Sequence, residues 1–123
     1  MADCCSGSNR LIYSCAGGSD VGEIADHVAR KLRDTGCGKM SCMAGVGAHL
    51  SGFIASAKGA DENIVIDGCP KTCGKKIFKH LDIPCRSYVL TEMGLVKGKT
   101  PVTDEIVDKM AKEITKSLAL KTS

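Results

Sequence analysis

The stretch Asn63-Ile64-Val65-Ile66-Asp67-Gly68-Cys69-Pro70 decides the fold of this chain. Its unbroken β-branched centre is typical of a strand that is buried on both faces. The Gly-Cys pair that follows predicts a turn, and proline suits the first position of a helix. We expect this helix over residues 70–81, with three side chains on its inner face: Cys73, Ile77 and Leu81. A buried strand followed at once by a helix is typical of a βαβ unit in a parallel sheet.

The same alternation of strands and helices extends in both directions along the chain. Before the central strand we expect, in order, a strand over residues 10–15, a helix over 20–34, a strand over 38–42 and a helix over 48–58. After the helix at 70–81 we expect a strand over 86–90, a Gly/Lys-rich loop over 94–102 and a last helix capped by Thr103. Asp20 and Glu23 have the spacing of a capping box at the start of the first helix.

This order of elements predicts an α/β fold. We expect a single domain with a four-stranded, mostly parallel sheet and helices on both faces, which is a Rossmann-like or flavodoxin-like architecture. With the strands numbered along the chain, we expect the order 2-1-3-4 across the sheet. We assign residues 10–120 to this domain and residues 1–9 to a loose N-terminal tail.

The composition excludes several classes of protein. Hydrophobic residues make up 43% of the 123 residues and charged residues 25%, as in an ordinary folded domain. No apolar run approaches the roughly 20 residues that span a bilayer, so we expect no membrane segment. The net charge is only +3, aromatic residues make up 3% and tryptophan is absent, so we expect no nucleic-acid partner.

Eight cysteines are many for a chain of this length. The first residues show no basic region followed by an apolar stretch, so we see no signal peptide and expect a cytoplasmic protein. In a reducing compartment, clustered cysteines indicate metal or thiol chemistry more often than disulfides.

Three of the cysteines lie at the carboxyl end of a predicted strand or just past it: Cys15, Cys42 and Cys69. Ligands of open α/β sheets bind at this edge. In the order 2-1-3-4 the three strands are neighbours, and the outer two lie about 10 Å apart. A metal with bonds of about 2.3 Å to sulfur could be reached from all three strand ends.

Cys73 is the fourth candidate ligand, because it lies four residues after Cys69 across the first turn of the predicted helix. The positive end of that helix would favour a thiolate at Cys69. Four thiolates select zinc or an iron–sulfur cluster over magnesium or calcium. The alternative is that these cysteines are inert members of the core.

The remaining candidates have simpler interpretations. Cys37 and Cys85 precede strands, so we place them at the opposite edge as structural residues, and Cys4 and Cys5 belong to the tail, as a disordered pair or as extra ligands. His49 follows a glycine loop near the proposed site and could act as a base or a ligand. The glycine loops match no nucleotide-binding fingerprint. For Asp67 we expect a backbone-capping role rather than acid–base chemistry.

Three segments of the chain resemble the DGC domain family, which is named for its Asp-Gly-Cys signature: Tyr13–Gly17, Lys39–Gly47 and Ile64–Cys73. The family is described as binding zinc through four cysteines. The resemblance implies Cys15, Cys42, Cys69 and Cys73 as the ligands, the same four that the strand ends select. Some relatives carry another cysteine three residues after the first, where this chain has Gly18.

These observations lead to three hypotheses. The first is a small zinc-binding protein in which four thiolates make a closed structural or metal-handling site, or three leave a position open. The second is a thiol oxidoreductase with Cys69 as the nucleophile and Cys73 or Cys42 as the resolving thiol. The third is an iron–sulfur electron carrier on the same ligands. The patterns predict a metal ion as partner, name no protein partner, and do not decide whether the chain is an enzyme.

Overall fold

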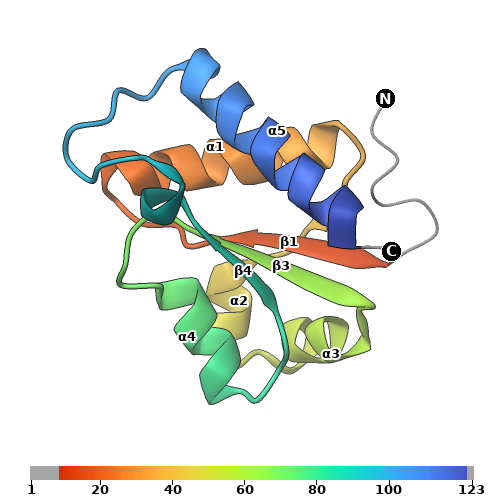
Figure 1. Cartoon of the computed structure of the whole chain (residues 1–123). Coiled ribbons are helices and arrows are strands. Elements are labelled where there is room, and N and C mark those ends of the chain that lie inside the picture. Colours follow the sequence, from red (N-terminus) through yellow and green to blue (C-terminus); the bar gives the residue numbers. More distant parts are fainter. Residues whose placement is uncertain (1–8, 122–123) are drawn as a thin grey trace.

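The computed structural model describes residues 9–121 (Figure 1). The tail predicted for residues 1–9, with Cys4 and Cys5, lies outside the described residues apart from Asn9. The elements follow one another as β1 (Arg10–Ser14), α1 (Asp20–Asp34), β2 (Lys39–Met40), α2 (Met43–Gly47), α3 (Ser51–Gly59), β3 (Glu62–Asp67), α4 (Cys73–His80), β4 (Arg86–Val89), the short 3₁₀ helix η1 (Leu90–Met93) and α5 (Asp104–Lys121).

The four strands form one parallel sheet in the order β2-β1-β3-β4. The predicted α/β class and strand order are therefore confirmed. The pairing of β1 with β3 runs from Arg10 opposite Glu62 to Ser14 opposite Ile66. β2 is shorter than predicted, with Leu11 opposite Lys39 and Ile12 opposite Met40.

Helices cover both faces of the sheet, as the sequence predicts (Figure 1). Helices α1 and α5 lie on one face, where Ile12, Ile64 and Ile66 are buried in a core with their apolar side chains. Helices α2, α3 and α4 lie on the other face, where Tyr13 and Val65 are buried. Alternate residues of β1 and β3 thus enter opposite cores, because successive side chains of a strand point to opposite faces.

Two predicted helices differ from the observed ones. Helix α4 begins at Cys73 instead of residue 70, because Pro70 belongs to a turn that the amide of Thr72 closes on the carbonyl of Cys69 at 3.1 Å. Thr72 adopts a left-handed conformation with φ 47°, which a helix cannot include. The helix predicted over 48–58 is α3, which begins only at Ser51 after a turn in which His49 has φ 62°, and the short helix α2 before that turn was not predicted.

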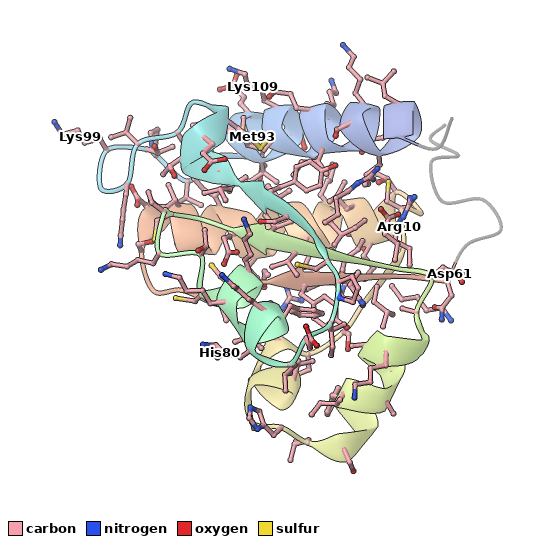
Figure 2. The ribbon with its side chains drawn as sticks, turned by 60° about the horizontal axis from the view of Figure 1, so that its bottom comes forward. Arg10, Asp61, His80, Met93, Lys99 and Lys109 are labelled. Carbon is pink, nitrogen blue, oxygen red and sulfur yellow. The ribbon has the colours of Figure 1, made fainter. Side chains whose placement is uncertain are left out.

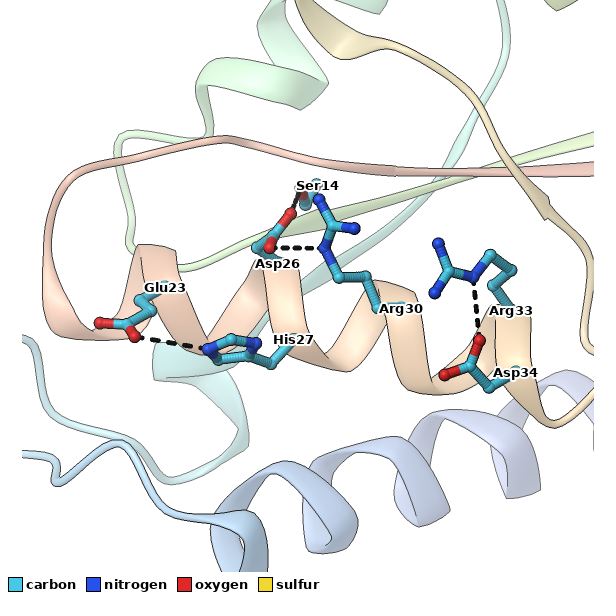
Figure 3. A network of polar contacts seen from close by, with 7 residues as sticks. All are labelled: Ser14, Glu23, Asp26, His27, Arg30, Arg33 and Asp34. Atoms are coloured by element: carbon cyan, nitrogen blue, oxygen red, sulfur yellow. Dashed lines mark hydrogen bonds and ion pairs between the residues drawn. The ribbon is translucent and has the colours of Figure 1, made fainter.

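One predicted helix cap is observed and another is not. Thr103 caps α5 as predicted, and its Oγ1 accepts the amide of Ile106 at 3.3 Å. Helix α1 is capped by Ser19 rather than Asp20, and the Ser19 hydroxyl accepts the amide of Gly22 at 3.1 Å. Glu23 does not complete a capping box; its carboxylate contacts His27 at 3.3 Å (Figure 3).

No helix in the described part of the chain is both long enough and apolar enough to cross a membrane.

Candidate thiol and metal site

The carboxyl edge of the sheet holds the cysteines that the sequence placed there. Cys15 directly follows β1, and its amide donates to the carbonyl of Ile66 at 3.0 Å, which extends the pairing with β3 by one residue. Cys69 follows β3 by two residues. The pairing of β1 with β2 likewise continues past Met40, since the amide of Ser41 donates to the carbonyl of Ile12 at 3.0 Å. The exits of β1, β2 and β3 therefore lie side by side.

Three of the four candidate ligands line one small pocket at this edge. Cys15, Cys69 and Cys73 surround a cavity of about 170 Å³. Cys15 and Cys69 are partly buried, while Cys73 is exposed at the first position of α4. The six cysteines of the described residues are thiols rather than disulfides.

Cys42 is not among the residues that line this pocket. It is the N-cap of α2, and its Sγ accepts the amide of Gly45 at 3.3 Å. Within residues 9–121, no three His, Cys, Asp or Glu side chains are placed so that they hold a metal ion together. By donor type the pocket thiols suit a soft divalent ion such as zinc, but their side chains would have to turn toward one point to share it.

Asp67 organises the start of α4. Its side chain is 1% exposed, and its two carboxylate oxygens accept the amides of Gly74 at 2.8 Å and Lys75 at 3.1 Å. The predicted capping role of Asp67 is thus confirmed. Burial raises the pKa of this carboxyl group above its usual value, although the two amides oppose the shift.

This cap corrects the expected role of the helix dipole at Cys69. Cys69 lies four residues before the first residue of α4, so it is not at the helix terminus. The amides of the first turn of α4 are directed to the carboxylate of Asp67 instead. Another group must therefore supply any positive charge that acts on the sulfur of Cys69.

Backbone packing forms the inner wall of the pocket. A Cβ atom on Gly68 would lie 2.6 Å from the carbonyl carbon of Val21, and one on Gly22 would lie 2.6 Å from the carbonyl oxygen of Gly17. The loop after β1, the first turn of α1 and the turn after β3 are therefore in direct backbone contact. Glycine is required at these positions because any side chain would separate the three segments.

Lys97 contacts the candidate site, although the sequence patterns did not single it out. Its Nζ lies 3.6 Å from the Sγ of Cys69 and donates to it, from a loop whose only visible signal was its glycine and lysine content. A positively charged ammonium group therefore lies beside the sulfur. Gly94 and Gly98, on either side of Lys97, have φ values of 104° and 87°, which fix the course of the loop.

Asp20 ties this loop to α1. Its carboxylate accepts the amides of Gly98 at 2.9 Å and Thr100 at 3.1 Å, across about 80 residues of sequence. These hydrogen bonds hold the pKa of Asp20 below its usual value. Asp20, which the sequence predicts as part of a capping box, instead holds the loop that places Lys97 next to Cys69.

Replacing Asp20 with alanine is expected to release the loop. The Gly98 and Thr100 amides would lose their acceptor and exchange with solvent about tenfold faster, as measured by hydrogen exchange in NMR spectra. Because the pKa of native Asp20 is lowered, its contribution is present above the ordinary carboxyl pKa and is lost as pH falls through the native value. Wild-type exchange corrected for its intrinsic pH dependence should therefore rise below about pH 4. Asp104→Ala, at the start of α5, is the control, and equal exchange in both variants would contradict the anchor.

The start of α1 has no free amides for a phosphate group. The amide of Val21 donates to Asp20 at 2.8 Å, that of Gly22 to the Ser19 hydroxyl, and that of Glu23 to the Ser19 carbonyl at 2.9 Å. Farther along α1, several polar side chains pair with one another or with Ser14 (Figure 3), and Lys31 pairs with Asp108 of α5 at 3.2 Å. This arrangement agrees with the lack of a nucleotide fingerprint in the sequence.

The other cysteines lie away from the pocket, as predicted. Cys85 lines a larger cavity of about 500 Å³ at the amino ends of the strands, near Asp61 and Arg86. Figure 2 shows Arg10 and Asp61 at this end of the molecule and Lys99 at the other. Burial raises the pKa of the Cys85 thiol. Cys37 is buried, with its Sγ 3.7 Å from the hydroxyl oxygen of Thr115.

None of the three histidines contributes to the pocket lining. His49 is exposed in the turn between α2 and α3. His27 is half exposed on α1, and His80 is exposed at the end of α4 (Figure 2).

Comparison with known proteins identifies the family. The sequence model of the DGC domain matches residues 11–114, which include β1 through most of α5. The chain belongs to the DGC domain family. It is 34% identical over 88 residues to the anaerobic and virulence modulator AnvM of Pseudomonas aeruginosa, a match that covers 71% of this chain and 67% of AnvM. No solved structure matches the chain.

The structure gives each residue of the Asp-Gly-Cys signature of this DGC domain a distinct role. Asp67 caps α4, Gly68 admits the backbone of α1, and Cys69 presents its sulfur to the pocket. The signature therefore joins a helix cap, a close backbone contact and a thiol within three residues.

Proposed function

We propose that this DGC domain binds a zinc ion at the carboxyl edge of its sheet, with Cys15, Cys42, Cys69 and Cys73 as the ligands. The observation that carries the proposal is that three of these thiols, from three separate segments, line one pocket. The fourth, Cys42, follows the neighbouring strand β2 by two residues. Thiolate sulfur is the ligand type that zinc prefers in closed structural sites.

For zinc to bind all four thiols, two existing contacts of the sulfur atoms must be replaced by bonds to the metal. Cys42 must turn its sulfur away from the amide of Gly45, and Cys69 must release the ammonium group of Lys97. With four thiolates the site is closed, which suits a structural or metal-handling role. Since the ligands bind as thiolates, zinc affinity falls as the pH is lowered. We place the protein in the cytoplasm, where its cysteines stay reduced.

The test is the metal content of the full chain, purified without added metal. We expect about one zinc ion per chain by elemental analysis, and loss of zinc in Cys69→Ser and Cys42→Ser. Cys85→Ser and Cys37→Ser are the matched controls and should keep the metal, because both residues lie outside the pocket. Full zinc content in both Cys69→Ser and Cys42→Ser would contradict the site, and a brown protein that contains iron would indicate an iron–sulfur cluster.

A second candidate function is thiol chemistry at Cys69 without a metal. The contact of Lys97 with the sulfur favours it. So does the observation that, among residues 9–121, no three His, Cys, Asp or Glu side chains are placed to bind one metal ion. Cys15 and Cys73 line the same pocket and are the available resolving thiols, whereas Cys42 does not line it. A metal-free protein whose Cys69 reacts faster than Cys85 would favour this candidate over zinc binding.

A further inference from the structure

The charges around the thiol pocket are unbalanced. Its lining residues include two lysines, Lys71 and Lys97, and one acidic residue, Asp67. Asp67 is buried and directs both oxygens to the amides of Gly74 and Lys75. Both lysines are exposed, and the Nζ of Lys97 lies 3.6 Å from the Sγ of Cys69. A molecule that approaches the sulfur of Cys69 therefore meets positive charge first.

The position of Lys97 is built into the fold. The hydroxyl of Thr100 donates to the carbonyl of Val96 at 2.7 Å and accepts the amide of Val96 at 2.9 Å, which closes the loop on itself. Asp20 then fastens the closed loop to α1. Asp20, Val96, Gly98 and Thr100 thus act together to hold Lys97 beside Cys69.

We infer that the pocket selects small anionic molecules that react at the sulfur of Cys69, with Lys97 and Lys71 as specificity-determining residues. This inference rests on the thiol chemistry proposed above for Cys69. In the reaction, the sulfur forms a bond to an electrophilic atom of the anion, and a leaving group departs with the electron pair of the broken bond. The cavity of about 170 Å³ has room for roughly the volume of five or six water molecules, so the substrate is a small molecule.

The test compares two alkylating agents that differ in charge. Iodoacetate is an anion and iodoacetamide is neutral, and each forms a carbon–sulfur bond and releases iodide. Their rate constants at Cys69 are measured by peptide mass spectrometry on the protein as purified, at pH 7.5 and low salt. Because the same thiolate attacks both agents, the ratio of the two rate constants does not depend on the fraction of the thiol that is ionised.

We expect the ratio of iodoacetate to iodoacetamide to be about fivefold higher at Cys69 than at the thiol of an unstructured peptide. Lys97→Met should remove most of this preference and Lys71→Met part of it, and added salt should weaken it. Lys99→Met is the matched control, because Lys99 lies on the same loop and extends away from the molecule (Figure 2). A ratio equal to that of the peptide, or one that Lys97→Met leaves unchanged, would overturn the inference.

The neutral agent tests the underlying thiol chemistry separately. If iodoacetamide modifies Cys69 faster than Cys85, the thiol chemistry stands whatever the ratio of the two agents. Protection of Cys69 from both agents would overturn the thiol chemistry and the anion preference together, while leaving zinc binding in place.

Discussion

Gly68→Ala is expected to destabilise the protein by about 3 kcal/mol and to lower its melting temperature by roughly 10 °C. The added Cβ would lie 2.6 Å from the carbonyl carbon and oxygen of Val21 and 2.7 Å from the amide nitrogen of Gly22. These are backbone atoms of the first turn of α1, which cannot rotate away as a side chain can. The helix must shift as a body, and the contact between β3 and α1 would open at the thiol pocket.

Gly52→Ala is the matched control for this substitution. Gly52 lies in the first turn of α3, and nothing surrounds the position of its missing Cβ within 4 Å. Alanine is a better helix former than glycine, so the control should be neutral or more stable by up to about 1 kcal/mol. Thermal unfolding followed by circular dichroism measures both variants. Equal melting temperatures for Gly68→Ala and the wild type would show that α1 does not press on this turn.

Asp67→Ala is expected to cost about 2 kcal/mol at pH 7, because the buried amide of Gly74 and the partly buried amide of Lys75 lose their acceptors. Urea unfolding measures the loss. Asp67→Asn is the control, since it keeps the shape and one acceptor oxygen and should lose less than the alanine variant. Similar stabilities of Asp67→Ala and the wild type would remove Asp67 as the cap of α4.

The stability difference between the wild type and Asp67→Ala should also depend on pH. Burial raises the pKa of native Asp67 above that of an unfolded carboxyl group. The native protein therefore binds this proton more tightly, and the contribution of Asp67 is fully present below the unfolded pKa and declines as pH rises through the native pKa. The difference should be larger at pH 4 than at pH 7, and a difference that grows with pH would contradict the shift.

The sequence predicted the architecture well because its signals are local and agree with one another. The β-branched run Asn63–Asp67 and the helical spacing of apolar residues after Asp20 each fix an element by periodicity alone. Once strands alternate with helices, the handedness of the crossovers leaves few strand orders to consider. The same reasoning placed Cys15, Cys42 and Cys69 at one edge of the sheet, where their segments are found.

The details of the site were beyond the sequence because they depend on contacts between distant segments. Lys97 reaches Cys69 only because Asp20 binds its loop, and residues about 80 positions apart leave no periodic signal. Helix α4 starts at Cys73 rather than at residue 70 because Thr72 takes a left-handed conformation, which its residue type does not predict. The orientation of the Cys42 sulfur likewise depends on the amide that it accepts from Gly45.

The inner wall of the thiol pocket is made of backbone, whereas exposed side chains stand at its opening. This difference has an evolutionary consequence. Gly22 and Gly68 leave no room for a side chain where the segments touch, so the backbone that carries the cysteines is intolerant of change there. Lys71 and Lys97 stand at the opening on exposed positions, where substitution perturbs no packing. Paralogues can therefore differ in the molecules that they bind by exchanging these two side chains, while the sulfur atoms keep their positions. The opening of the pocket is thus the place to begin a redesign.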